Sequence, residues 1–161
     1  MMKKNFEFVY DVYDSIEELD TDDALLLKKA RETTSLAYAP YSKFNVAAAA
    51  RLSNGEIVTG TNQENASYPV GLCAERVLLS SVSSLHPQVP VETVAVSYKS
   101  DIAASDHPIA PCGICRQSLH EYEFRLNHPI RLILGGMEGK IFVIPSAAYL
   151  LPFSFTKDDL G

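Results

Sequence analysis

The sequence lacks the features that mark several large classes of protein. It has no run of about 18 apolar residues, so it offers no segment for crossing a lipid bilayer, and we expect no membrane partner. Its 14 lysines and arginines form no cluster and are outnumbered by 20 acidic residues. That balance disfavours a nucleic-acid polymer as partner, because such binding depends on a basic surface, and leaves a small neutral ligand acceptable. Repeats, low-complexity tracts and Gly/Ser linkers are also missing, so we expect one domain over 1–161.

Cysteine is scarce too. The chain has three, an odd number that argues for metal binding or reactivity and against a disulfide framework. Lys3 and Lys4 lie near the start, but no apolar run follows them. No secretory signal is therefore recognised, and we expect a cytoplasmic protein.

The pattern of apolar residues predicts helices and strands in the order α-β-β-α-β-α-β-β. Asp20 and Thr21 offer N-caps for a first helix that ends at Pro40. Further helices are expected over 72–84 and 113–124, and strands over 44–52, 56–60, 91–98, 130–134 and 140–144. Such an order implies a sheet covered by helices on both faces. Residues 1–20 form an N-terminal extension, in which 6–13 is a short strand or an ordered arm.

Asn54 and Gly55 separate the first two strands. This pair predicts a tight hairpin, in whose favoured turn both central positions take positive φ.

All three cysteines lie in two short motifs, each predicted where a loop enters a helix. The first is 71–76 (GLCAER) and the second is 111–117 (PCGICRQ). A Cys-x-Glu followed about forty residues later by Pro-Cys-x-x-Cys is typical of the zinc deaminases, in their three-cysteine form. Cys112 and Cys115 at a helix start place two sulfurs within reach of one tetrahedral ion, and Cys73 supplies a third. Three protein ligands leave one position for water, which is the arrangement of a catalytic Zn²⁺.

Two neighbouring charged residues have predicted roles in this chemistry. Glu75 follows Cys73 by two residues, so it can lie beside the metal without ligating it. A carboxylate there can take a proton from water, deliver it to the ring nitrogen of a pyrimidine and then serve the leaving ammonia. Three thiolates leave a zinc ion with one excess negative charge, which Arg76, and also Arg116, can offset by hydrogen-bonding the sulfurs.

Other interpretations of the same residues stay open at this point. A lone Cys-x-x-Cys can be a redox pair or a packing pair, and Glu75 alone can be an acid that favours a helix start. A structural zinc module would require a fourth ligand. The four histidines (His86, His107, His120 and His128) are expected in turns, in a loop and on a helix surface. The conjunction of both spacings with the acid at its offset favours a deaminase.

The sequence resembles the small homotetrameric cytidine deaminases from about Leu26 to Leu160. Five segments carry the resemblance: 37–44 (AYAPYSKF), 62–69 (NQENASYP), 73–76 (CAER), 111–117 (PCGICRQ) and 150–155 (LLPFSF). It implies a three-layer α/β/α fold with a five-stranded mixed sheet and one Zn²⁺ per subunit. The implied activity is hydrolysis at a cyclic amidine, converting cytidine and deoxycytidine to uridine and deoxyuridine in pyrimidine salvage.

The resemblance also places six residues at the substrate: Phe44, Asn62, Glu64, Ala66, Tyr68 and Phe155. Asn62 and Glu64 would hold a ribose hydroxyl, and Phe44 would pack against the pyrimidine. Phe155 would reach the site of a neighbouring subunit, so that the homotetramer has shared active sites. The alternatives are a polar turn for Asn62 and Glu64, plain core for Phe44, and a tail residue on its own core for Phe155.

Three departures from the family's pattern stand out. Ala47 replaces a frequent glycine, 99–110 lengthens the segment between the cysteine motifs, and 1–20 has no counterpart in the short members. A blasticidin-type deaminase of nucleoside analogues, or a polynucleotide deaminase, would share the zinc site. The 62–68 stretch fits the nucleoside enzymes better, and the acidic balance opposes a polynucleotide.

Overall fold

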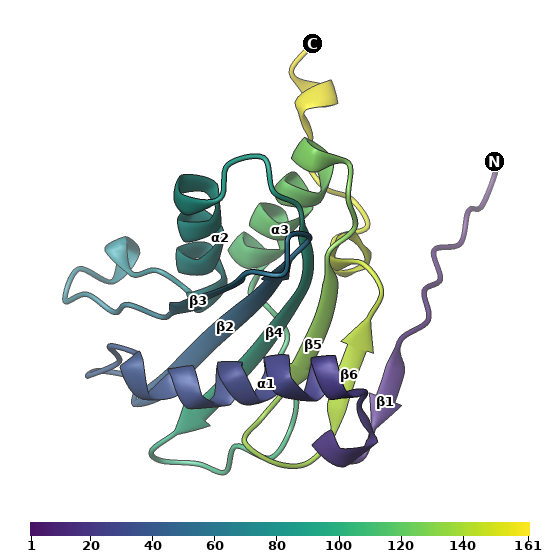
Figure 1. Ribbon diagram of the computed structural model, residues 1–161. Helices are drawn as coiled ribbons and strands as arrows, with labels where there is room; N and C mark the ends of the chain where they lie inside the picture. Colours follow the sequence, from purple (N-terminus) through teal and green to yellow (C-terminus); the bar gives the residue numbers. More distant parts are fainter.

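The computed structural model describes all residues from Met1 to Gly161. A single mixed sheet of six strands lies between helices on its two faces (Figure 1). The helices are α1 (Thr21–Thr33), α2 (Ala74–Leu85) and α3 (Gly113–Leu126). The strands are β1 (Asp11–Tyr13), β2 (Phe44–Leu52), β3 (Ile57–Thr61), β4 (Val91–Ser100), β5 (Arg131–Gly135) and β6 (Ile141–Ile144), in the spatial order β1-β6-β5-β4-β2-β3. No helix is both long and apolar enough to cross a membrane.

The three layers follow from side-chain alternation along the central strands. In β4, Val94 and Val96 point into the larger core beneath α2 and α3, whereas Ala95 points into the smaller core beneath α1. Figure 1 shows α1 crossing one face while α2 and α3 lie together on the other. The predicted α/β/α layering is confirmed. Ala47, also small, is fully buried on the α1 face of β2.

Strand directions place one edge of the sheet where a site can form. The β4–β5 pair is parallel and the other pairs are antiparallel. As a result β3, β4 and β5 point the same way, and their carboxyl ends share an edge. The connections to α2 and α3 leave from the carboxyl ends of β3 and β4. Crevices outside such ends are the usual ligand sites of open α/β sheets.

The sheet has six strands, so the expectation of five is wrong. The additional strand is β1, whose Val12 pairs with Phe142 of β6. Residues before Asp11 form no strand, but their aromatic side chains still pack on the body. The Phe8 ring lies 5.6 Å from Tyr149. These contacts join positions that are distant in sequence, so local alternation alone could not choose between an arm and a strand.

The hairpin between β2 and β3 forms, although its turn differs from the prediction. Gly55 has a φ of +86°, but Asn54 is not in the positive region. The Gly55 N–H donates to the Leu52 carbonyl at 2.9 Å, and the Leu52 N–H donates to the Glu56 carbonyl at 2.9 Å. This is a three-residue loop closed by glycine rather than a two-residue turn. The Asn54 side chain instead accepts from the Glu56 N–H at 3.1 Å.

Single residues position two of the helices, α1 through its N-cap and α2 through its packing on β3. Asp20 caps α1, as predicted, by accepting from the Asp23 N–H at 2.9 Å. On the other side of the sheet, Gly60 of β3 lets α2 approach closely. A Cβ at Gly60 would lie 2.4 Å from the Leu78 nitrogen and 2.7 Å from the Ala74 carbonyl oxygen. The missing side chain therefore lets the backbone of α2 pack directly on β3.

Candidate active site

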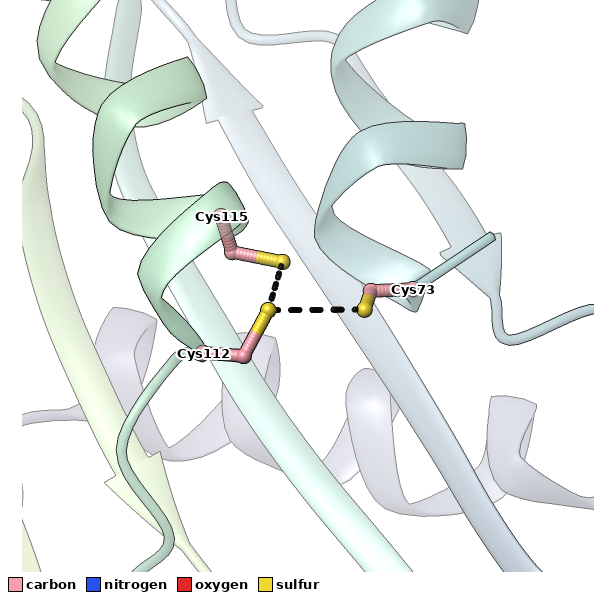
Figure 2. Close-up of side chains that lie close together, drawn as sticks. All are labelled: Cys73, Cys112 and Cys115. Carbon is pink, nitrogen blue, oxygen red and sulfur yellow. Dashed lines mark hydrogen bonds between the residues drawn. The ribbon is translucent and has the colours of Figure 1, made fainter. Parts of the chain in front are cut away.

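The N-termini of α2 and α3 bring all three cysteines together (Figure 2). Cys73 is the N-cap residue of α2, Cys112 is the N-cap residue of α3, and Cys115 lies in the first turn of α3. The sulfur of Cys112 lies 3.7 Å from that of Cys73 and 3.4 Å from that of Cys115. All three sulfurs fall within 4.8 Å of one another.

This arrangement fits a zinc ion. Zn–S bonds of about 2.3 Å in tetrahedral geometry separate sulfurs by roughly 3.8 Å, close to the spacing of the three cysteines. The donor set is all thiol, which suits Zn²⁺, and no fourth side chain joins the group. Three of the four histidines are engaged elsewhere, His107 with Tyr98, His120 with Ser154 and His128 with a backbone carbonyl, and His86 lies at the opposite end of α2 from Cys73. The three cysteines thus form an open site rather than a closed structural one.

The thiols are not equivalent. Hydrogen bonding from the Cys115 thiol, with a smaller contribution from Cys112 and from the charge of Arg76, lowers the pKa of Cys73 to about 6 against the opposing effect of burial. The same bond to Cys73, together with burial, raises the pKa of Cys115. The cluster therefore holds its first negative charge on Cys73, and a metal must displace a proton from Cys115.

Glu75 lies in the first turn of α2 and contributes to the wall of the adjacent cavity. Its side chain is buried, with 4% of its surface exposed. Burial raises the pKa of Glu75, while its own backbone N–H and the Cys115 thiol act in the opposite direction. A carboxyl group whose pKa is raised can both accept and return a proton near neutral pH.

The arginines beside the cysteines do not bond to sulfur. Arg76 acts on Cys73 through its charge. Arg116 donates from Nε to the Pro111 carbonyl at 2.8 Å and from Nη1 to the Leu150 carbonyl at 3.3 Å. The expected sulfur hydrogen bond therefore forms at neither arginine, and Arg116 instead joins the second motif to the C-terminal 3₁₀ turn.

A cavity of about 620 Å³ opens beside the cysteines, within the range of small-molecule sites. Seven of the predicted site residues contribute to its wall: Phe44, Asn62, Glu64, Tyr68, Cys73, Glu75 and Cys112. Cys115 lies buried behind them. The apolar part of the wall is completed by residues without a predicted role, among them Val46, Leu72, Ile109 and Ala110. These carry no chemical signature in the sequence, although Ile109 and Ala110 directly precede the second cysteine motif.

The loop between β3 and α2 forms one side of the cavity and is closed at its base. Gln63 and Leu72 exchange two backbone hydrogen bonds of 2.9 Å. The Asn62 amide spans the start of β2, donating to the Phe44 carbonyl at 2.9 Å and accepting from the Val46 N–H at 2.8 Å. Asn62 thus pairs with the backbone of β2 rather than with its own loop, and it still contributes to the cavity wall.

Glu64 is held by the residues before β2. Its carboxylate accepts from the backbone N–H groups of Tyr41 at 2.9 Å and Ser42 at 3.2 Å. The Ser42 side chain and these N–H groups lower the pKa of Glu64. The group is therefore ionised at neutral pH and available as a hydrogen-bond acceptor.

Besides Cys115, three of the predicted residues do not contribute to the cavity wall of their own chain: Ala66, Arg76 and Phe155. The backbone carbonyl of Phe155 accepts from Gln117 Nε2 of α3 at 2.8 Å, and its side chain is 59% exposed. The backbone at Phe155 is therefore tied to α3, while more than half of the residue's surface stays exposed.

Comparison with known proteins agrees with this geometry. The family described as "Cytidine and deoxycytidylate deaminase zinc-binding region" matches residues 20–126. The cytidine deaminase of Halalkalibacterium halodurans is 36% identical over 140 residues, covering 87% of this chain and 98% of that protein. The crystal structure of cytidine deaminase from Burkholderia pseudomallei has a TM-score of 0.71 at 37% identity, covering 81% and 97% of the two chains. The cytidine deaminase of Mycobacterium tuberculosis has a TM-score of 0.66 at 30% identity, with coverages of 85% and 99%. The chain belongs to the zinc-dependent cytidine deaminase family.

Proposed function

We propose that this enzyme converts cytidine and deoxycytidine to the corresponding uridine nucleosides, with water as co-substrate and ammonia as second product. One observation carries the proposal: an open three-sulfur site and a buried carboxyl group meet at the wall of a cavity large enough for a nucleoside. Cys73, Cys112 and Cys115 would hold the zinc ion. When bound, zinc supplies a Lewis acid and a water of lowered pKa.

Glu75 moves the protons. It takes one from the attacking water as C4 of the pyrimidine is attacked, and gives it to the ring nitrogen N3. It then takes the second proton and passes it to the amine as ammonia leaves. The raised pKa of Glu75 suits a group that must hold a proton between these steps. Arg76 offsets part of the negative charge of the cysteines through its proximity to Cys73.

The sugar is read by Asn62 and Glu64. After its two backbone bonds, the Asn62 amide keeps one N–H and one lone pair for a ligand. Glu64 is ionised and accepts from a hydroxyl group. A free base would leave these polar groups unpaired, which disfavours its binding. Phe44, at the start of β2, packs against the pyrimidine ring from the cavity wall.

The site is completed by other subunits of a homotetramer. Phe155 is more than half exposed and outside its own cavity, and Ala66 and Tyr68 lie on an exposed loop. In the assembly, Phe155 reaches a neighbouring cavity. Sedimentation velocity measures the assembly, and Phe155→Ala is expected to raise KM without changing zinc content. Unchanged kinetics in that variant would refute the shared site.

Ultraviolet absorbance provides the test of activity. Wild type is expected to turn over cytidine and deoxycytidine, but neither cytosine nor single-stranded DNA. Glu75→Gln should retain zinc and lose about 10²- to 10⁴-fold in kcat/KM. Asp22→Asn is the matched control, because Asp22 is also an acid in the first turn of a helix but lies on α1. No turnover of any nucleoside by zinc-loaded wild type would disprove the function, and equal losses in both variants would disprove the role of Glu75.

A further inference from the structure

Tyr98 contacts Phe44 of the cavity wall and also His107, in the loop that carries Ile109 and Ala110 of that wall. It is among the largest fully buried side chains, with 1% of its surface exposed, and does not itself line the cavity. In the sheet it lies opposite Val46 on the face covered by α2 and α3. Phe44 is its diagonal neighbour on that face, with the two rings stacked at 4.8 Å between centroids and 22° between planes. The Phe44 ring is therefore supported from behind by Tyr98.

The hydroxyl of Tyr98 contacts the loop that carries the opposite wall. It lies 3.2 Å from Nδ1 and 3.4 Å from Nε2 of His107. Asp106 Oδ1 lies 3.0 Å from Nδ1, and because an ionised carboxylate only accepts, it assigns the proton to Nδ1. Nε2 is then free to accept from the Tyr98 hydroxyl. Burial raises the pKa of Tyr98, so this hydroxyl stays protonated and can donate.

The loop has few other attachments at this point. Its earlier part is fixed where the Met137 N–H donates to the Ser105 carbonyl at 2.6 Å, and its later part where Arg116 donates to the Pro111 carbonyl. Between these two carbonyls, the hydrogen bonds to the rest of the fold come from His107 alone. Ile109 and Ala110, which line the cavity, follow it by two and three residues.

We propose that Tyr98 is a positioning residue that fixes the distance between the two walls of the pyrimidine site, holding Phe44 through its ring and the 108–111 loop through His107. The substrate assignment rests on the proposed function. The Tyr98 hydroxyl bonds to His107 and makes no hydrogen bond to the cysteines or to Glu75. Its loss is therefore expected to change nucleoside binding and to leave proton transfer alone.

Kinetics on the zinc-loaded enzyme test the proposal. Tyr98→Phe keeps the stacked ring and removes the hydroxyl, and His107→Leu removes its partner. Each should raise KM for cytidine about three- to tenfold, with kcat within about twofold and zinc content unchanged. The double variant should be no worse than either single one, because both break the same bond. His107→Gln, which keeps an acceptor, should recover much of the affinity.

The control variant is His128→Leu, another histidine before a proline, whose ring bonds only to its neighbour's carbonyl. It should leave KM unchanged. Calorimetric titration of cytidine into the Glu75→Gln background should show the same three- to tenfold loss of affinity in Tyr98→Phe. A purely structural role would lower thermal stability without changing KM. That result, or additive effects in the double variant, would overturn the proposal.

A separate measurement distinguishes this inference from the proposed function. In ¹⁵N-histidine spectra, wild type should show His107 fixed as the Nδ1–H tautomer, and Tyr98→Phe should show averaging between tautomers. If wild type failed to turn over cytidine, the proposed function would be refuted, but this spectrum would still show whether Tyr98 and His107 are hydrogen-bonded. A fixed tautomer in wild type supports it, and an averaged one overturns it.

Discussion

Glu123 offers the sharpest quantitative test of how α3 is joined to the C-terminal segment of the chain. This carboxylate on α3 is buried, with 8% of its surface exposed, and accepts four hydrogen bonds. Oε1 accepts from the Ile130 N–H at 2.7 Å, the Ser146 hydroxyl at 2.9 Å and the Ala147 N–H at 2.9 Å. Oε2 accepts from the Ala148 N–H at 3.0 Å. Glu123 thus joins α3 to the start of β5 and to the turn that precedes the tail.

The cost of Glu123→Ala follows from the donors that it leaves behind. The Ile130 N–H, on a residue 1% exposed, loses its acceptor, whereas the Ala147 N–H keeps the Ile130 carbonyl at 2.9 Å and the Ala148 N–H keeps the Ser146 hydroxyl at 3.2 Å. The one unsatisfied buried donor costs about 1–3 kcal/mol, and each of the three other lost bonds costs about 0.5 kcal/mol because an alternative acceptor or water replaces Glu123. The sum is about 2–4 kcal/mol in the free energy of unfolding. For a chain of this length it lowers Tm by about 4–16 °C.

Urea unfolding of the zinc-loaded protein, followed by circular dichroism, measures the effect. Glu121→Ala is the control, because Glu121 lies on the same helix and makes no side-chain hydrogen bond, so its removal should cost less than about 0.5 kcal/mol. Glu123→Gln keeps one carbonyl oxygen, so its loss in free energy of unfolding should lie between those of Glu123→Ala and Glu121→Ala. If Glu123→Ala unfolded within about 1 kcal/mol of wild type, the reasoning from unsatisfied donors would be refuted.

Three further outcomes are expected. Gly60→Ala would press a methyl group on the backbone of α2, so it should lower the free energy of unfolding by about 1–3 kcal/mol and reduce the amount of bound zinc. Gly113→Ala is the control, because its added Cβ meets open space, and it should change neither quantity. Asp20→Ala should cost about 1 kcal/mol at pH 7 through loss of the helix cap. The Asp23 N–H lowers the pKa of Asp20 in the folded protein, so this stabilisation is present above the unfolded pKa of about 3.9 and is lost as pH falls through the lower folded pKa. The stabilities of Asp20→Ala and wild type should therefore converge in acid. Asp20→Asn, which has no carboxyl group, should show no such pH dependence. Adding zinc at pH 7 to protein from which a chelator has removed the metal should release protons, at least one of them from Cys115. Titration calorimetry in buffers of different ionisation enthalpy measures this release. A heat of binding that did not depend on the buffer would contradict it.

The sequence predicted most of the secondary structure because the signals are local. Asp20 as a cap and the β-branched run that became β4 each act within a few residues. The failures arose where structure depends on distant partners. Strand β1 forms because it pairs with β6, more than one hundred residues away in sequence. The alternation of side chains in 6–13 could not show that such a partner exists. The turn at Gly55 adopted a three-residue form because Leu52 and Glu56 close it.

The candidate site shows the same division. The cysteine spacings predicted a cluster because each motif sits at a helix start, and two helix starts at the carboxyl edge of one sheet meet. The apolar wall at Ile109 and Ala110 was not predicted, because such residues become part of a site only through tertiary placement. Arg116 was misassigned for a related reason: its carbonyl partner on Leu150 lies 34 positions further along the chain.

Every thiol of the chain belongs to the one cluster at the N-termini of α2 and α3. A thiol reagent therefore reports on that cluster without background, and its stoichiometry counts metal-free molecules directly. Because all three thiols are zinc ligands, oxidation of any of them removes the metal site. Once metal is lost, Cys73 is a thiolate at neutral pH, the form that oxidants attack most readily, and Cys112 is 3.7 Å away. Storage under reducing conditions, or with zinc present, would preserve the capacity to bind metal.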